Sequence, residues 1–174
     1  MLVKIAQRVE EFKGNVAQAG FFPGQAYADG TPIAYVGAIQ EYGDPSHNIP
    51  SRSFMRAAAK EDSEHWSEDM KRGLRAVLRG TTSAENVLEQ VGGAMAADIQ
   101  AQIAAIDSPP LSPITVMLRG MRRNDPGLVV TGKTVGEAAR RVEDKETNYG
   151  ASTKPLVDLG IMEAAVTSKV GKPG

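Results

Sequence analysis

The sequence predicts an α+β fold, with a small, mostly antiparallel sheet packed against a long antiparallel helical hairpin. Two long segments, 51–79 and 82–106, repeat apolar residues at helical spacing. Short alternating segments at 15–22 and 161–170 are typical of strands. A chain of 174 residues suffices for one domain with a modest core, so we expect a single α+β domain over 1–174.

The composition is typical of a soluble globular protein with few aromatic residues. Apolar residues make up 41% of the chain and aromatic residues only 5%, so the core must bury little area per residue, and we expect neighbouring subunits to add stability. Cysteine is absent, which excludes disulfides and thiol chemistry and suits a reducing cytoplasm. No stretch approaches the ~18 apolar residues of a membrane span. The net charge of −1 argues against a surface committed wholly to nucleic acid.

The N-terminal part of the chain consists of short elements separated by turns. Residues 2–12 fit either a helix or a strand, because their apolar residues satisfy both spacings. A Pro-Gly pair closes the strand predicted at 15–22. Pro32 follows a turn signal and suits the first turn of a short helix over 33–42.

The first helix of the predicted hairpin has clear end signals. Ser51 or Ser53 is expected to cap its start, because either hydroxyl can accept a hydrogen bond from a free amide of the first turn. The helix is expected to run to about Arg79, where basic residues complement the negative end of the helix dipole. Gly80 is expected to end it.

The second helix of the hairpin is expected to begin at a capping box formed by Thr82 and Glu85 and to run to about Ile106. It contains two adjacent glycines, Gly92 and Gly93, each of which costs about 1 kcal/mol inside a helix. That cost is tolerable where the glycines let another backbone approach, either from the first helix or from another subunit.

The segment that follows changes character and is rich in Pro, Gly and Thr. We expect 113–153 to form an extended loop or β-hairpin insertion, with strands within 113–135. Six basic and two acidic residues between 113 and 142 give that stretch a net charge of +4. A solvated loop is one interpretation. The other is contact with a partner subunit or with DNA through the basic residues Arg119, Arg122, Arg123, Lys133, Arg140 and Arg141.

One segment matches a nucleotide-binding motif by its letters. Residues 127–134, GLVVTGKT, satisfy the phosphate-binding pattern GxxxxGK[ST]. A charged turn precedes the first glycine where a buried strand is required, and only forty residues follow Thr134, too few for a nucleotide-binding sheet. The internal Leu-Val-Val is itself typical of a strand. These features favour a chance match in a loop over an enzyme.

The two histidines are the other candidates for chemistry. His65 lies with Glu61 and Asp69 at spacing i, i+4, i+8, along one helix face, where a divalent metal or a solvated acidic surface are the two interpretations. The solvated surface is preferred because no further ligand is suggested by spacing. His47 stands in a polar loop without a nucleophile nearby. We therefore predict no catalytic residue, no cofactor, no metal and no enzyme activity.

Three short patches occur in a fixed order along the chain. The first ends a predicted helix, the second leads into the hairpin, and the third precedes the last predicted strand. Their marker residues are Glu41, Tyr42, Gly43, Pro50, Arg52, Phe54, Arg56, Pro155, Leu156, Asp158 and Gly160. Together these patches resemble motifs of the tail-completion or head–tail joining (neck) proteins of long-tailed bacteriophages. Ser53 and Leu159 depart from the Pro and Thr that are usual there.

The physical roles expected of these marker residues are structural. Arg52 and Arg56 are expected to pair with carboxylates such as Glu41. Phe54 is expected to pin the first turn of the helix to the sheet. Asp158 and the nearby glycine suit a turn before the last strand.

The resemblance implies a structural virion protein that forms a ring, most simply a hexamer, around the DNA channel at the neck or the head-proximal end of the tail. The expected partners are further copies of the chain, neighbouring neck, connector or tail-tube proteins, and DNA by non-specific contact, with no membrane. The protein is expected in the virion after assembly in the host cytoplasm. The alternatives are another minor virion or assembly adaptor, and a small DNA-binding module that uses the basic segment.

Overall fold

Helices dominate the chain, and two short strands form the only sheet among the described residues. The computed structural model describes residues 2–148 and 150–172. The elements follow one another as α1 (Leu2–Glu10), β1 (Val16–Gly20), α2 (Ile33–Tyr42), the 3-10 turn η1 (Pro45–His47), α3 (Met55–Arg79), α4 (Ala84–Ala105), α5 (Pro113–Asn124), α6 (Gly132–Glu143), α7 (Ile161–Ala165) and β2 (Thr167–Gly171). The mixed helix-and-sheet class is confirmed, with more helix than predicted.

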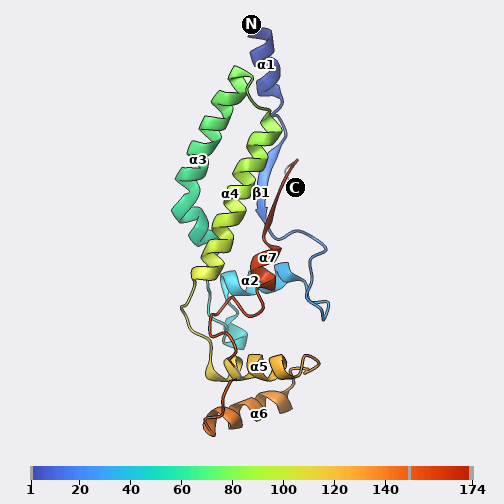
Figure 1. The fold of residues 1–174 in the computed structure, drawn as a ribbon, viewed down its shortest axis with the longest axis vertical. Helices are drawn as coiled ribbons and strands as arrows, with labels where there is room; N and C mark the ends of the chain where they lie inside the picture. The colour runs from blue at the N-terminus through green and yellow to red at the C-terminus, as the bar shows by residue number, and fades with distance from the viewer. Residues whose placement is uncertain (1, 149, 173–174) are drawn as a thin grey trace.

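Helices α3 and α4 lie side by side over most of their length and form the long axis of the molecule (Figure 1). Gly73 brings them close, because a Cβ atom at this position would lie 2.3 Å from Cγ1 of Val87 on α4. Gly80 ends α3 in the left-handed conformation with φ of 79°, as predicted. The predicted capping box at the start of α4 is wrong by one residue: Ser83 is the N-cap, and its hydroxyl accepts from the amide of Asn86.

Strands β1 and β2 pair antiparallel, with Gln18 opposite Lys169, and one face of this sheet packs on α4. Gly92 permits this contact. A Cβ atom there would lie 3.2 Å from Cβ of Ser168 and 3.5 Å from Cβ of Ala17. The element that approaches Gly92 is the chain's own sheet and not the first helix of the hairpin, which was one of the two approaches predicted. A Cβ atom at Gly93, by contrast, would meet nothing within 4 Å.

The last predicted strand, over 161–170, begins too early. Residues 161–165 form the short helix α7, and β2 starts at Thr167. The helix prevails because Met162 and Ala165, three residues apart, both turn into the core, which alternating residues of a strand would not allow. Residues 2–12, which fitted both interpretations, form helix α1 over Leu2–Glu10 and a turn after it.

The interior is divided into small clusters. The main cluster joins α2, α3, α4 and α7 and includes Phe54 and Ile103, which are both fully buried. A second cluster around Val77 and Val91 joins the far ends of α3 and α4. A third lies apart from these, between α5 and α6. No single large core supports the whole chain within the described residues.

The prediction of an extended loop or β-hairpin over 113–153, with strands within 113–135, is wrong. Helices α5 and α6 pack against each other there, at the opposite end of the molecule from α1 (Figure 1). Ser112 caps α5 by accepting from the amide of Thr115, and Pro113 fits its first turn. Met117, Met121 and Ala138 form the buried contact between the two helices. Pro and Gly residues between these short helices hid their period in the sequence.

No helix within the described residues is long and apolar enough to cross a membrane.

Candidate functional site

The first two patches of marker residues meet through the carboxylate of Glu41. This side chain, at the end of α2, is 3% exposed and points at the start of α3. Its Oε2 accepts hydrogen bonds from the amides of Phe54 at 2.8 Å and Met55 at 2.9 Å, and its Oε1 accepts from the amide of Arg56 at 3.2 Å. Three amides that a helix start leaves free are thereby satisfied by a negative charge at the positive end of the helix dipole.

The prediction that Ser51 or Ser53 caps α3 is therefore wrong, because Glu41 accepts the hydrogen bonds from the first amides of this helix. The hydroxyl of Ser53 donates to Oε1 of Glu41 at 2.9 Å, and that of Ser51 donates to the carbonyl of Glu41 at 2.7 Å. A cap supplied by a residue 14 positions away in the chain ties α2 to α3.

Opposing effects act on the pKa of Glu41. Burial raises it, but hydrogen bonds from the Arg56 side chain, from the amides of Met55 and Arg56, and from Ser53 together lower it below its usual value. Nε of Arg56 contacts Oε1 at 2.8 Å, which confirms this predicted pair. The guanidinium of Arg56 also lies 5.1 Å from the ring centre of Tyr42.

Gly43 makes the turn between α2 and the following segment possible. Its φ of 80° lies in the region that favours glycine. A Cβ atom at this position would lie 2.8 Å from the amide nitrogen of Ser51 and 2.9 Å from the carbonyl oxygen of Ile49. The glycine that ends the first patch thus has a steric cause.

Arg52 does not pair with Glu41, which corrects that prediction. Its Nε donates to the carbonyl of Pro109 at 2.8 Å and its Nη2 to the carbonyl of Pro110 at 3.2 Å, while Nη1 donates to Gln40. The side chain is buried, and burial followed by the nearby charge of Arg119 lowers the pKa of Arg52. Arg52 therefore links the Pro-rich segment after α4 to the connection between α2 and α3.

The third patch is held by Arg119 of α5. Its guanidinium donates to the carbonyls of Lys154 at 2.7 Å and Pro155 at 2.9 Å, and Nε lies 3.7 Å from the carboxylate of Asp158. Burial lowers the pKa of Arg119, and Asp158 opposes that shift. The glycine of this patch, Gly160, has φ of 72° and starts α7, so the predicted turn precedes a helix and not the last strand.

Phe54 links the patches through the core. It is fully buried, and its ring packs edge-on against Phe21, which follows β1, at 6.1 Å between ring centres. Leu156 of the third patch belongs to the same core cluster. The three patches, distant in sequence, therefore surround one end of the main core, which we call the junction (the residues of 41–56 and 155–160).

A groove of about 670 Å³ opens beside the junction. Apolar residues of its lining include Val36, Leu156 and Met162, and Leu159, which also lines it, is 75% exposed. The residues that carry charge in the groove are Asp29, Arg119, Arg122, Arg123 and Asp158. Such a surface suits an extended protein segment better than a small polar substrate.

The six basic residues predicted as partner or DNA contacts differ in whether contacts within the chain hold their side chains. Arg119 is held by carbonyls, Arg123 donates to the carbonyl of Gly150, and Arg141 contacts Glu137 and Glu146. The remaining three, Arg122, Lys133 and Arg140, are exposed. Four more charged residues follow this stretch at 143–146, so that seven basic and five acidic residues over 113–146 leave a net charge of +2.

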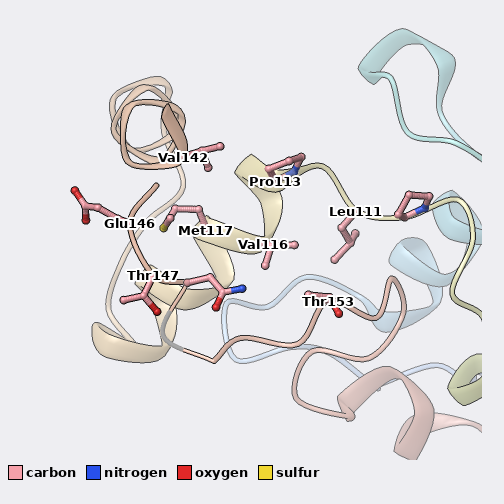
Figure 2. Close-up of a pocket in the computed structure, with 10 residues that line it drawn as sticks. Leu111, Pro113, Val116, Met117, Val142, Glu146, Thr147 and Thr153 are labelled. Atoms are coloured by element: carbon pink, nitrogen blue, oxygen red, sulfur yellow. The ribbon is translucent and has the colours of Figure 1, made fainter. Parts of the chain in front are cut away.

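A second cavity, of about 500 Å³, lies between α5, the end of α6 and the segments beside them (Figure 2). Met117 and Val142 contribute to its lining, and Glu146 is its carboxylate. That carboxylate lies 3.7 Å from Nη1 of Arg141.

Helix α6 starts within the segment that matches the phosphate-binding pattern, but the described residues before it lack the buried strand that the motif requires. This segment follows helix α5 and a turn, and no strand leads into it. The start of α6 is already satisfied by a capping box, in which the amide of Thr134 bonds to the side chain of Thr131 and the amide of Thr131 to the side chain of Thr134. Two of the amides at this helix start, those of Thr131 and Thr134, are thus engaged within the chain.

The histidines do not form a metal centre in the described part of the chain, where no group of three candidate ligands comes together. Nε2 of His65 lies 3.6 Å from Asp69, whereas Glu61 accepts a hydrogen bond from Gln102 of α4. Nδ1 of His47 lies 2.6 Å from Asp44. The pKa of Asp44 is lowered mainly by a hydrogen bond from Ser46 and to a smaller extent by one from His47. Both histidines are exposed.

Comparisons with protein-family models, with curated proteins and with solved structures found no match.

Proposed function

We propose that the chain is a structural subunit of a tailed bacteriophage particle, forming a ring at the neck or the head-proximal end of the tail. It acts by assembling, and its ring joins neighbouring neck, connector or tail-tube proteins around the DNA channel of the virion. Six copies are expected. The proposal rests on the resemblance of the three patches and on their order along the chain.

The junction is the observation that supports this proposal most directly. The patches that carry the resemblance are joined by Glu41, Arg52 and Arg119, and Phe54 and Leu156 share one core cluster. If the marker residues of a family are shared because they determine its fold, they are expected to contact one another in the folded chain, as these do. Their role is to build the subunit, whose outer surfaces then make the contacts.

The surface around the junction supports assembly as the mode of action. Large apolar side chains stay exposed there: Tyr35 62%, Tyr42 70%, Leu159 75% and Ile161 39%. Several such residues beside a groove mark a protein contact more often than a free surface. The small separate cores are also typical of subunits that gain stability from their neighbours.

The test combines microscopy with thermal unfolding of the purified protein. We expect rings with a central channel in negative-stain images and a midpoint of unfolding that rises with protein concentration, because assembly stabilises the folded chain by mass action. The variant Leu159→Lys places a charge on this surface and should lower the proportion of rings while leaving the helical content unchanged. A chain that stays monomeric, with a constant midpoint over a hundredfold range of concentration, contradicts the proposal.

A small DNA-binding module is the second candidate function, and the three exposed cations Arg122, Lys133 and Arg140 favour it. The two functions differ in what binding requires. A module binds DNA as a monomer, whereas a channel ring contacts DNA only as an assembly.

A further inference from the structure

The loop between α5 and α6 presents apolar side chains to solvent within residues 128–131, which we call the donor segment. Val129 is 70% exposed and Val130 is 49% exposed. β-branched residues of this kind favour strands, yet the donor segment forms no helix or strand. In the described chain the backbone of Val130 has no hydrogen-bond partner, while Leu128 anchors the segment to the α5–α6 core.

The β1–β2 sheet has two edges at which another strand could pair. Within the described residues each strand pairs only with the other, so each leaves one edge with unpaired backbone N–H and C=O groups. Ala17 and Ser168 face Gly92 of α4, so Gln18 and Lys169 lie on the opposite, outer face. A sheet of two strands is marginal in water, and a third strand would stabilise it.

The donor segment and the sheet lie far apart within one chain. Figure 1 shows the α5–α6 pair at one end of the molecule, while the sheet lies beyond α2 and α7. The donor segment therefore reaches a sheet only in another copy. A contact between two different surfaces of identical chains is heterologous, which is the type of contact that closes a ring.

We propose that the donor segment of one copy adds as a third strand to an open edge of the β1–β2 sheet of a neighbouring copy. Main-chain hydrogen bonds then provide the adhesion, and the two valines project to opposite faces of the extended sheet. This inference rests on the proposed ring and names the contact that holds it together.

Crosslinking provides a direct test because the chain contains no cysteine. A Val130→Cys chain is co-expressed either with a Gln18→Cys chain or with a Lys169→Cys chain, and a short bismaleimide joins nearby thiols. Gln18 and Lys169 mark the two strands on the outer face of the sheet. We expect covalent dimers in at least one of the two pairings, and the reactive one identifies the edge.

The control for this experiment replaces Val130→Cys by Glu68→Cys, at an exposed position of α3. It should give no covalent dimer with either strand variant. Dimers in neither of the Val130 pairings, or in equal yield with the Glu68 control, overturn the strand addition.

A charge placed on the donor segment separates this inference from the ring itself. Val130→Asp lowers strand propensity and should raise the concentration for half-assembly roughly tenfold or more. Val135→Asp adds the same charge to an exposed position of α6 and should assemble like the wild type. If the wild type forms rings that Val130→Asp leaves unchanged, the strand addition is wrong and the ring stands. A wild type that is monomeric at all concentrations overturns both.

Discussion

Glu41 shows how one buried charge organises the junction. Its carboxylate accepts from three amides at the start of α3, from Ser53 and from Arg56. An ionised group in the interior is costly unless all its hydrogen-bonding capacity is met, and here it is met by donors from one helix start. The sequence alone suggested the contact with Arg56, but not the cap, because a cap from a distant residue has no local spacing signal.

Replacing Glu41 by Gln should lower the free energy of unfolding by about 2–4 kcal/mol, because charge-assisted hydrogen bonds are lost and an amide nitrogen faces backbone donors. Urea unfolding followed by circular dichroism measures the change. Glu68→Gln, on the exposed side of α3, serves as the control and should stay within about 0.5 kcal/mol of the wild type.

The pH dependence follows from the lowered pKa of Glu41. A carboxyl whose pKa is lower in the folded than in the unfolded chain adds stability that is fully present above the unfolded value, about 4.3. That stability is lost as the pH falls through the folded pKa. The difference in unfolding free energy between wild type and Glu41→Gln should therefore shrink from about pH 7 towards pH 3. A difference that stays constant across this range would count against a charged cap.

At the scale of the elements, glycine positions determine how closely the layers approach. Gly73 brings α3 against Val87 of α4, and Gly92 lets the sheet rest on the other side of α4. Gly93, its immediate neighbour, has open space around it. Two adjacent residues with the same helix propensity therefore differ only in their tertiary surroundings.

This difference leads to a paired prediction. Gly93→Ala should raise the free energy of unfolding by about 0.5–1 kcal/mol, because Ala favours the helix and meets no neighbour. Gly92→Ala should show little or none of that gain, since its methyl group lies 3.2 Å from Cβ of Ser168. Thermal and urea unfolding of both variants measure the effect. Equal stabilisation by the two substitutions would mean that the sheet does not pack on α4 as described.

The sequence predicted the elements whose signals are local and missed those that depend on distant residues. The end of α3 follows from Gly80 and β1 from its alternation, whereas the start of α4 was predicted one residue early, at Thr82 instead of Ser83. The α5–α6 pair was missed because each helix has only 12 residues and its buried stripe is too short to show a period among Pro and Gly. Among the predicted contact residues, only the structure distinguishes Arg119, held by four carbonyls, from exposed Arg122.

At the scale of the whole molecule, the chain consists of a long α3–α4 body with the sheet along it and a smaller α5–α6 unit at one end (Figure 1). Arg52 and Arg119 connect the two parts through backbone carbonyls. This arrangement presents the donor segment and the sheet edges on separate parts of one subunit. Identical subunits can therefore meet through unlike surfaces, which the proposed ring requires.

Contact with DNA is a separate property of the assembled particle and has its own test. Replacing Arg122, Lys133 and Arg140 by Ala should reduce the slope of log affinity against log salt concentration by about 2.7, if each contacts one phosphate. Fluorescence anisotropy with duplex DNA measures this slope. Ala at Lys71, Arg75 and Arg79 removes three exposed cations of α3 as a control. Equal slopes in both variants and the wild type would remove α5–α6 as a DNA contact.

Native mass spectrometry of the purified chain tests the central claim, assembly into a closed ring, most directly. A ring has a fixed number of subunits, so one discrete species should dominate, and six copies of the 18.5 kDa chain give about 111 kDa. The same mass should persist over a range of protein concentrations. A monomer of 18.5 kDa, or a ladder of masses without a preferred number of copies, would contradict the account.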